Sequence, residues 1–161
     1  MKQLSILLLF MGIFFSGMAQ NIKDELKKGP SLSFPIGVTR DDMDSDAKDF
    51  KNLADLNPEM AKLFPNKAKL MGSFYLTPEM GAFLVVTEIK KGLQEFHLMT
   101  YSIKTNQKLD SKQIGSMNKP GDGNNTYQTF EIDKNWDITI NKKKTGPNAP
   151  EPKTSMMKIQ K

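Results

Sequence analysis

The residues with the clearest metal-binding spacing are aspartates in the first third of the chain. Asp42, Asp44 and Asp46 alternate with other residues, as the first three ligands of a calcium-binding loop do. Such a loop has glycine at its sixth position and a bidentate glutamate at its twelfth, but these positions hold Ala47 and Leu53. An acidic first helical turn, which the helix dipole favours, explains the aspartates without a metal. The sequence therefore suggests only a weak surface calcium site, and we expect no cofactor.

Catalysis by an imidazole would depend on His97, because the chain has one histidine and no cysteine. Cys–His catalysis and multi-histidine metal sites are thereby excluded. His97 lies among apolar neighbours in a predicted strand, without a nucleophile-elbow motif beside it. Glu88, Glu95 and Glu131 lie on or beside predicted strands and could meet in a cleft as a hydrolase pair. Charged residues on a solvated sheet face are far commoner, so we expect a protein that is not an enzyme.

The side chains best suited to hold a sugar or an anion are two aromatic residues and a lysine run. Tyr101 lies on one face of a predicted strand, and Trp136 begins another. Lys142, Lys143 and Lys144 open a predicted loop beyond that second strand. An aromatic ring near lysines suits contact with a glycan or an anionic headgroup, although a core position for Trp136 and a solvated loop are the simpler interpretations. We predict the partner surface at Tyr101, or at the end that carries Trp136 and the three lysines.

The formal net charge is +5, and nearly all the positive charge is lysine, with Arg40 the only arginine. A basic protein can bind nucleic acid, but lysine is less suited than arginine to bidentate phosphate contacts. A lysine-rich solvated surface is the better interpretation, and no nucleic-acid partner is expected.

Residues 1–19 have the order of a secretory signal peptide. Lys2 gives the start a positive charge, residues 4–15 are mainly apolar and uncharged, and Gly17 and Ala19 form a small-residue cleavage pattern. A transmembrane helix needs about 20 apolar residues, and this run is shorter. We predict cleavage after Ala19, with no transmembrane segment left. Without cysteine there is no lipidated N-terminus, so we expect a soluble periplasmic or extracellular protein that is not a lipoprotein.

The rest of the chain predicts an N-terminal arm over 20–40 and a single β-rich domain over 41–161. The arm can form one or two helical turns over 22–28 and is otherwise expected to be loosely held. The best helix candidate lies near 44–56, where apolar residues recur at helical spacing.

About seven strands follow, joined by short turns. They are predicted over 70–76, 82–90, 93–104, 108–115, 127–132, 136–141 and 154–160, with a loop over 142–152. The clearest alternation is Trp136, Ile138 and Ile140 against Asp137 and Thr139. We predict a mainly β fold: an antiparallel meander of about six to eight strands, as a small barrel or sandwich, with one short N-terminal helix.

From about residue 69 to the end, the chain resembles small exported β proteins common in Bacteroidetes, a largely uncharacterised group. The resemblance is carried by the signal ending in Ala19-Gln20 and by the segments FLVVTEI, MTYSIKTNQKLDSKQIG and FEIDKNWDITI. It implies an antiparallel meander and export, and it transfers no functional residues.

These observations favour an exported, non-enzymatic β domain that binds a protein, a glycan or another envelope component. The alternative is a carrier of a small hydrophobic ligand, with a barrel interior lined by Phe83, Val85, Phe96 and Met99. A hydrolase that uses carboxylates is less favoured.

Overall fold

The computed structural model describes residues 21–38, 50–64, 67–90, 93–118, 126–146 and 148–159. In these residues the chain is mainly β, with nine antiparallel strands in an open sheet and three short helices. The strands are β1 (Ile36–Val38), β2 (Lys51–Asn52), β3 (Ala68–Thr77), β4 (Met80–Lys90), β5 (Leu93–Ser102), β6 (Lys108–Asn118), β7 (Thr126–Ile132), β8 (Asp137–Lys144) and β9 (Lys153–Lys158). The helices are α1 (Ile22–Lys28), α3 (Leu53–Leu56) and α4 (Pro58–Ala61). The predicted antiparallel meander is confirmed.

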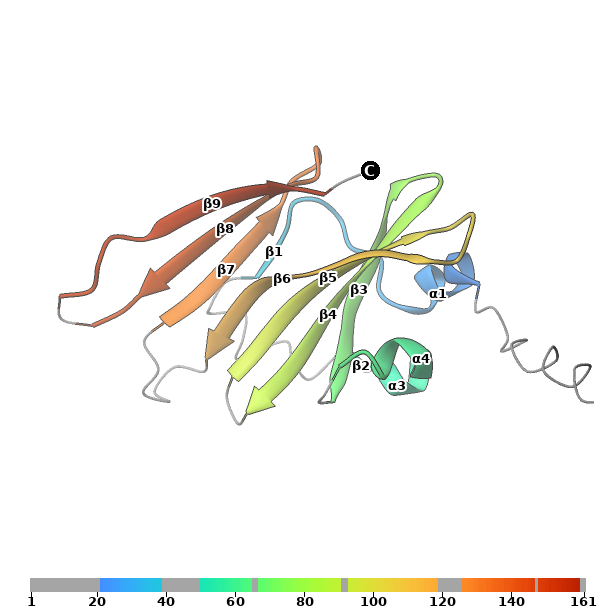
Figure 1. The fold of residues 1–161 in the computed structure, drawn as a ribbon, viewed down its shortest axis with the longest axis horizontal. Coiled ribbons are helices and arrows are strands. Elements are labelled where there is room, and N and C mark those ends of the chain that lie inside the picture. Colours follow the sequence, from blue (N-terminus) through green and yellow to red (C-terminus); the bar gives the residue numbers. More distant parts are fainter. Residues whose placement is uncertain are drawn as a thin grey trace, which may run out of the picture.

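The sheet follows the chain order from β2 to β9, with β1 added beside β7. One pair, Ser116 opposite Gln128, joins β6 to β7. The next part of β7 pairs with β1 instead, where Ile36 lies opposite Ile132. Figure 1 shows the result: β7, β8 and β9 splay away from β3–β6, and β1 lies beside β7. The meander therefore bends into two layers at this junction.

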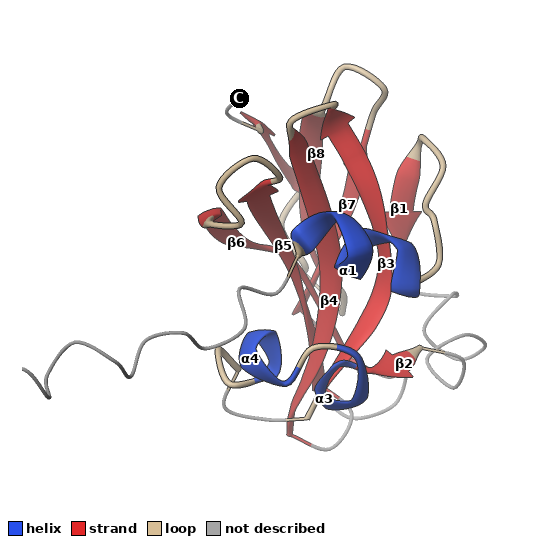
Figure 2. Ribbon diagram, turned by 90° about the vertical axis from the view of Figure 1, so that its right-hand side faces the viewer, coloured by secondary structure: helices blue, strands red, loops and turns tan. Residues whose placement is uncertain are grey.

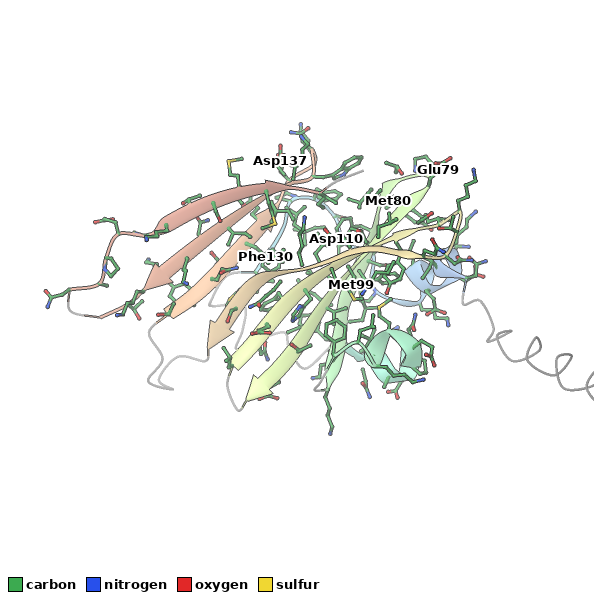
Figure 3. The ribbon with its side chains drawn as sticks, viewed as in Figure 1. Glu79, Met80, Met99, Asp110, Phe130 and Asp137 are labelled. Carbon is green, nitrogen blue, oxygen red and sulfur yellow. The ribbon has the colours of Figure 1, made fainter. Side chains whose placement is uncertain are left out.

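The main core lies between these two layers. Its largest contributors are branched and aromatic side chains, which pack well on pleated surfaces. Phe96 of β5 and Phe130 of β7 bring their rings to 5.5 Å across the layers, and Phe130 is labelled in Figure 3. The buried members of this core are Ile36, Val38, Phe74, Leu76, Met80, Ala82, Leu84, Val86, Phe96, Leu98, Ile114, Met117, Phe130, Ile132, Ile138, Ile140 and Ile159.

A second core covers the outer face of β3, β4 and β5, where the helices pack (Figure 2). Asn21 caps the N-terminus of α1, and its side chain accepts a hydrogen bond from the Lys23 amide. It buries Ile22 and Leu26 against the sheet. The buried members of this core are Ile22, Leu26, Leu53, Met60, Ala68, Leu70, Phe83, Val85, Met99 and Tyr101.

The N-terminal arm is an integral part of the fold, in contrast to the expectation of a loose segment. Beyond α1, the Leu32 amide donates to the Ser73 carbonyl, and the Ser73 amide donates to the Pro30 carbonyl. The chain then crosses to β7 as β1. These bonds tie the arm to strands of both layers.

Residues 44–49 of the helix expected near 44–56 lie outside the described ranges, and for residues 50–52 the predicted helix is wrong. Within the described residues, Lys51–Asn52 pairs with β3 as a short strand, and only Leu53–Leu56 is helical before Asn57 caps α4. Strand β8 also continues to Lys144, where a loop was expected to begin at Lys142. Across the described residues β9 pairs only with β8, so the sheet is open there and does not close into a barrel.

Candidate binding surface

Three lysines lie on one face of the sheet, where β8 ends and β9 begins. Lys142 lies directly opposite Lys153 on β9, and Lys144 lies two residues further along β8. Because side chains alternate along a strand, these three lysines share a face and Lys143 points to the other. We call Lys142, Lys144 and Lys153 the lysine face.

The lysine face continues the buried face of β8 beyond the core. Ile138 and Ile140 share that face and are buried, whereas all three lysines are exposed. The connection between β8 and β9 extends at the left of Figure 1, and β7 runs beside the lysine end of β8. The lysine face is therefore an open polar continuation of an otherwise apolar surface.

The charge on this face is not balanced by its described surroundings. Directly opposite residues of an antiparallel pair have Cβ atoms about 5 Å apart, and like charges there are destabilising. No ion pair to Lys142, Lys144 or Lys153 occurs among the residues that the structure describes. On β7, the residues opposite Lys142 and Lys144 are the uncharged Gln128 and Thr126. Anion binding would remove the cost of this arrangement.

Tyr101, the first residue of the predicted partner surface, lies in the second core. Its side chain is 7% exposed and meets Phe83 edge-to-face, with ring centroids 5.6 Å apart. Burial raises the pKa of Tyr101 to about 12, because a phenolate is poorly solvated there. The prediction that Tyr101 contributes to a partner surface is therefore wrong: the helical layer covers this face of β5.

Trp136 is half-buried against the main core and lies at the opposite end of β8 from the lysines. It is the last residue of a tight turn, with a φ of 65°. The Asp133 carboxylate shapes this turn by accepting from the amides of Asn135 and Asp137. Lys142 follows Trp136 by six positions along an extended chain, which corresponds to roughly 20 Å. The predicted end that would combine Trp136 with the lysines does not form.

His97 lies on the outer face of β5, under the chain that follows α4. Its Nε2 is 3.4 Å from a Glu95 carboxylate oxygen and 3.5 Å from the Thr87 hydroxyl. The Phe64 ring packs against the imidazole with centroids 5.2 Å apart. Burial lowers the pKa of His97, although Glu95 partly opposes this effect. These neighbours account for His97 as a packed strand residue.

The carboxylates considered for hydrolysis do not converge. Glu95 lies on the outer face of β5 with His97, whereas Glu88 lies on the other face of the sheet, opposite Gln94. Glu131 lies on β7 in the second layer and is exposed. The candidate calcium ligands Asp42, Asp44 and Asp46 lie outside the described residues. No group of three potential metal ligands occurs among the residues described.

The four residues proposed to line a ligand cavity belong to two different cores. Phe83, Val85 and Met99 face the helices, whereas Phe96 faces the second layer. The predicted shared lining is therefore wrong. All four are at most 2% exposed and are packed by other side chains.

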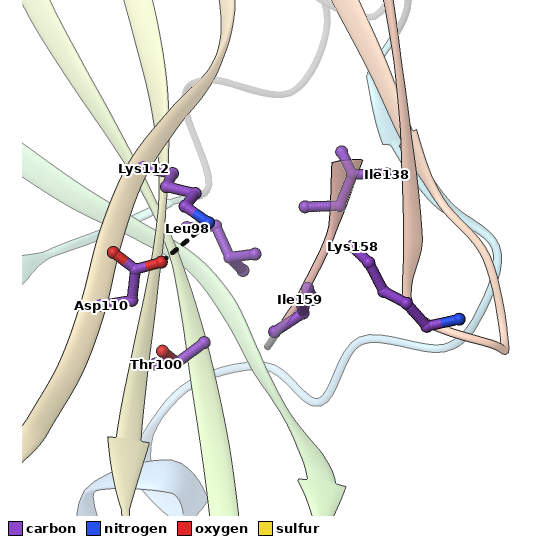
Figure 4. A pocket seen from close by; sticks show the side chains of 7 residues that line it. All are labelled: Leu98, Thr100, Asp110, Lys112, Ile138, Lys158 and Ile159. Carbon is purple, nitrogen blue, oxygen red and sulfur yellow. Dashed lines mark ion pairs between the residues drawn. The ribbon is translucent and has the colours of Figure 1, made fainter. Parts of the chain in front are cut away.

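A small crevice opens where β5 and β6 face the start of β8 and the end of β9 (Figure 4). Lys112 and Asp110 form an ion pair of 3.0 Å on one side, and Ile138 and Ile159 stand on the other. The free space is about one water molecule in size. The crevice is too small for an organic ligand.

Comparison with known proteins gives no family for this chain. No protein-family model, curated protein or solved structure matches it. Among the described residues, no helix combines the length and apolar character needed to cross a membrane. The lysine face therefore has to be interpreted from its own geometry.

Sequence reasoning found the run Lys142, Lys143 and Lys144 but missed Lys153. The run looked like the start of a loop because three successive lysines have no alternation. Lys153 joins the site only through the pairing of β8 with β9. One signal in the sequence could have revealed Lys153. The end of β8 and the start of β9 are both polar and have similar lengths, and they flank a connection that contains Gly and Pro residues, as the two arms of a hairpin do.

Proposed function

We propose that this protein is an exported, non-enzymatic β domain that binds an anionic partner of the cell envelope through the lysine face. The observation that carries the proposal is the direct pairing of Lys142 with Lys153, beside Lys144, without a described counter-charge. Exposed like charges in register lower the stability of a hairpin. A partner carrying negative charge would offset that cost.

The position of the lysines supports the same function. All three are exposed and lie at the end of the second layer, next to the connection between β8 and β9 that extends at the left of Figure 1. Their neighbours Gln128 and Ser155 offer an amide and a hydroxyl on the same face. The attraction is between exposed charges, so salt should weaken it strongly.

The test is binding of the mature protein to polygalacturonate, a polymer of acidic sugars, and to poly-glutamate. The variant replaces Lys142, Lys144 and Lys153 by glutamine, and we expect at least one polyanion to bind it roughly tenfold more weakly at low salt, a loss of about 1.4 kcal/mol. Neutral dextran should not bind. Calorimetry at two salt concentrations measures each affinity.

A matched control replaces Lys67, Lys104 and Lys134 by glutamine as well. These are three exposed lysines on other parts of the surface. The control removes the same charge and should keep most of the binding. If the two triple variants lose affinity equally, net charge alone is responsible and the lysine face is not the site. Absence of binding to both polyanions at low salt would also contradict the proposal.

A further inference from the structure

Strand β9 ends the sheet. Across the described residues it pairs with β8 on one side and with no strand on the other. An edge strand presents outward N–H and C=O groups that can pair with another chain. The six residues of β9 span about 20 Å, which is long enough for several backbone hydrogen bonds to an added strand.

The charges on β9 favour one kind of added strand. Its sequence, KTSMMK, has a lysine at each end and no acidic residue. Lys158 forms an ion pair of 3.3 Å with Asp137 but stays 64% exposed, and Lys153 belongs to the lysine face. A second copy pairing antiparallel along the full strand would bring Lys153 against Lys158, and this repulsion disfavours self-association.

We propose that β9 accepts an extended acidic segment of a partner protein as one more strand of the sheet. Backbone hydrogen bonds along β9 would provide affinity, and carboxylates near Lys153 would provide specificity. Met156, which is 71% exposed on the outward face of β9, would be covered by side chains of the added strand. This inference rests on the proposed function, because it identifies the anionic partner as a polypeptide.

The experiment uses the mature protein and a synthetic six-residue peptide with blocked ends, Glu-Val-Thr-Val-Thr-Glu. Two further peptides carry N-methyl groups on the first, third and fifth residues, or on the second, fourth and sixth. Alternate amides of a strand point to opposite edges, so only one of these peptides keeps the edge that faces β9. We expect one N-methylated peptide to bind close to the parent affinity and the other roughly tenfold more weakly, because it cannot donate to β9.

Two further measurements localise the binding. Amide chemical-shift changes caused by the parent peptide should centre on β9 and its neighbour β8. Lys153→Gln should weaken binding of the parent peptide. Lys67→Gln, at an exposed lysine directly before β3 in the other layer, should not. Equal affinity of all three peptides, or shift changes away from β9, would overturn the strand-addition proposal.

The outcomes separate this inference from the proposed function. If polygalacturonate binding depends on the lysine face but N-methylation has no effect on peptide affinity, the face binds anions and strand addition is wrong. If neither polyanions nor peptides respond to the lysine substitutions, the proposed function itself is wrong.

Discussion

At the scale of single residues, Tyr101 illustrates how position decides chemistry. Its phenol would be a typical contact residue on an open sheet face, but α1 and the short helices cover that face of β5. The pKa of Tyr101 is raised to about 12 from 10.0 because burial disfavours the phenolate. The raised pKa of Tyr101 therefore reflects burial in the folded protein and not contact with a partner.

The alkaline stability of the protein should depend on Tyr101. The folded state holds the phenolic proton more tightly than the unfolded state, so stability is fully present below about pH 10 and falls as the pH rises towards 12. The free energy of unfolding should fall by roughly 2–3 kcal/mol in total over this pH range. In Tyr101→Phe, denaturant unfolding between pH 9 and 12 should show a smaller loss.

The control for this prediction is Tyr75→Phe, because Tyr75 is 46% exposed. It should keep the alkaline loss seen in the unsubstituted protein. An identical alkaline loss in Tyr101→Phe and in the unsubstituted protein would show that the Tyr101 phenol does not cause it.

At the scale of elements, α1 fastens the N-terminal arm to the sheet. Leu26 inserts against β4, where Gly81 leaves space for it: a Cβ at Gly81 would collide with the Leu26 side chain. The Ser73 hydroxyl donates to the Leu26 carbonyl at 2.6 Å. A seven-residue helix is not stable alone in water, so α1 depends on this docking.

Leu26→Ala should therefore lower the free energy of unfolding by about 2–4 kcal/mol, since it leaves a cavity at a residue that is 4% exposed. Leu63→Ala, at a leucine that is 51% exposed, should change it by less than about 0.5 kcal/mol. Urea unfolding measures both. Equal, small effects would mean that the arm is not docked as described.

The elements also show what the sequence could and could not predict. Strands β3 to β9 were recognisable because their apolar residues alternate or form short β-branched runs, as Ile138 and Ile140 do. Strands β1 and β2 have three and two residues, too few for any pattern, and exist through pairing with β7 and β3. The burial of Tyr101 was not predictable from its strand, because the residues that cover it come from elsewhere in the chain.

At the scale of the whole molecule, two β layers share one core, although within the described ranges only the Ser116–Gln128 pair joins their strands at the bend. Gly115 lies at this junction, where a Cβ would come within 2.7 Å of the Phe130 ring. The layers are held by the side chains between them. The lysine face lies at the end of the second layer, beyond this shared core.

Export is the prediction that concerns the whole chain. Produced from Met1 in a bacterial host, the protein should be recovered outside the cytoplasm with Gln20 as its first residue, because residues 1–19 have the order of a signal peptide. Intact-mass measurement of the periplasmic fraction checks this. Leu8→Arg, which breaks the apolar run, should leave the uncleaved chain in the cytoplasm. Recovery of the unsubstituted chain from the cytoplasm with Met1 still present would contradict export.

Strand β4, buried on both faces, has a consequence for misfolding. Shifting a half-exposed strand by one position puts its apolar side chains into water, which penalises the error. On β4, Ala82 and Leu84 face one core while Phe83 and Val85 face the other, so a shifted strand would still bury apolar groups on both sides. A shift of β4 by one residue is instead penalised by a steric clash. It would bring a neighbouring side chain into the place of Gly81, where the Leu26 side chain leaves no room. The docking of α1 therefore disfavours a shifted register of β4.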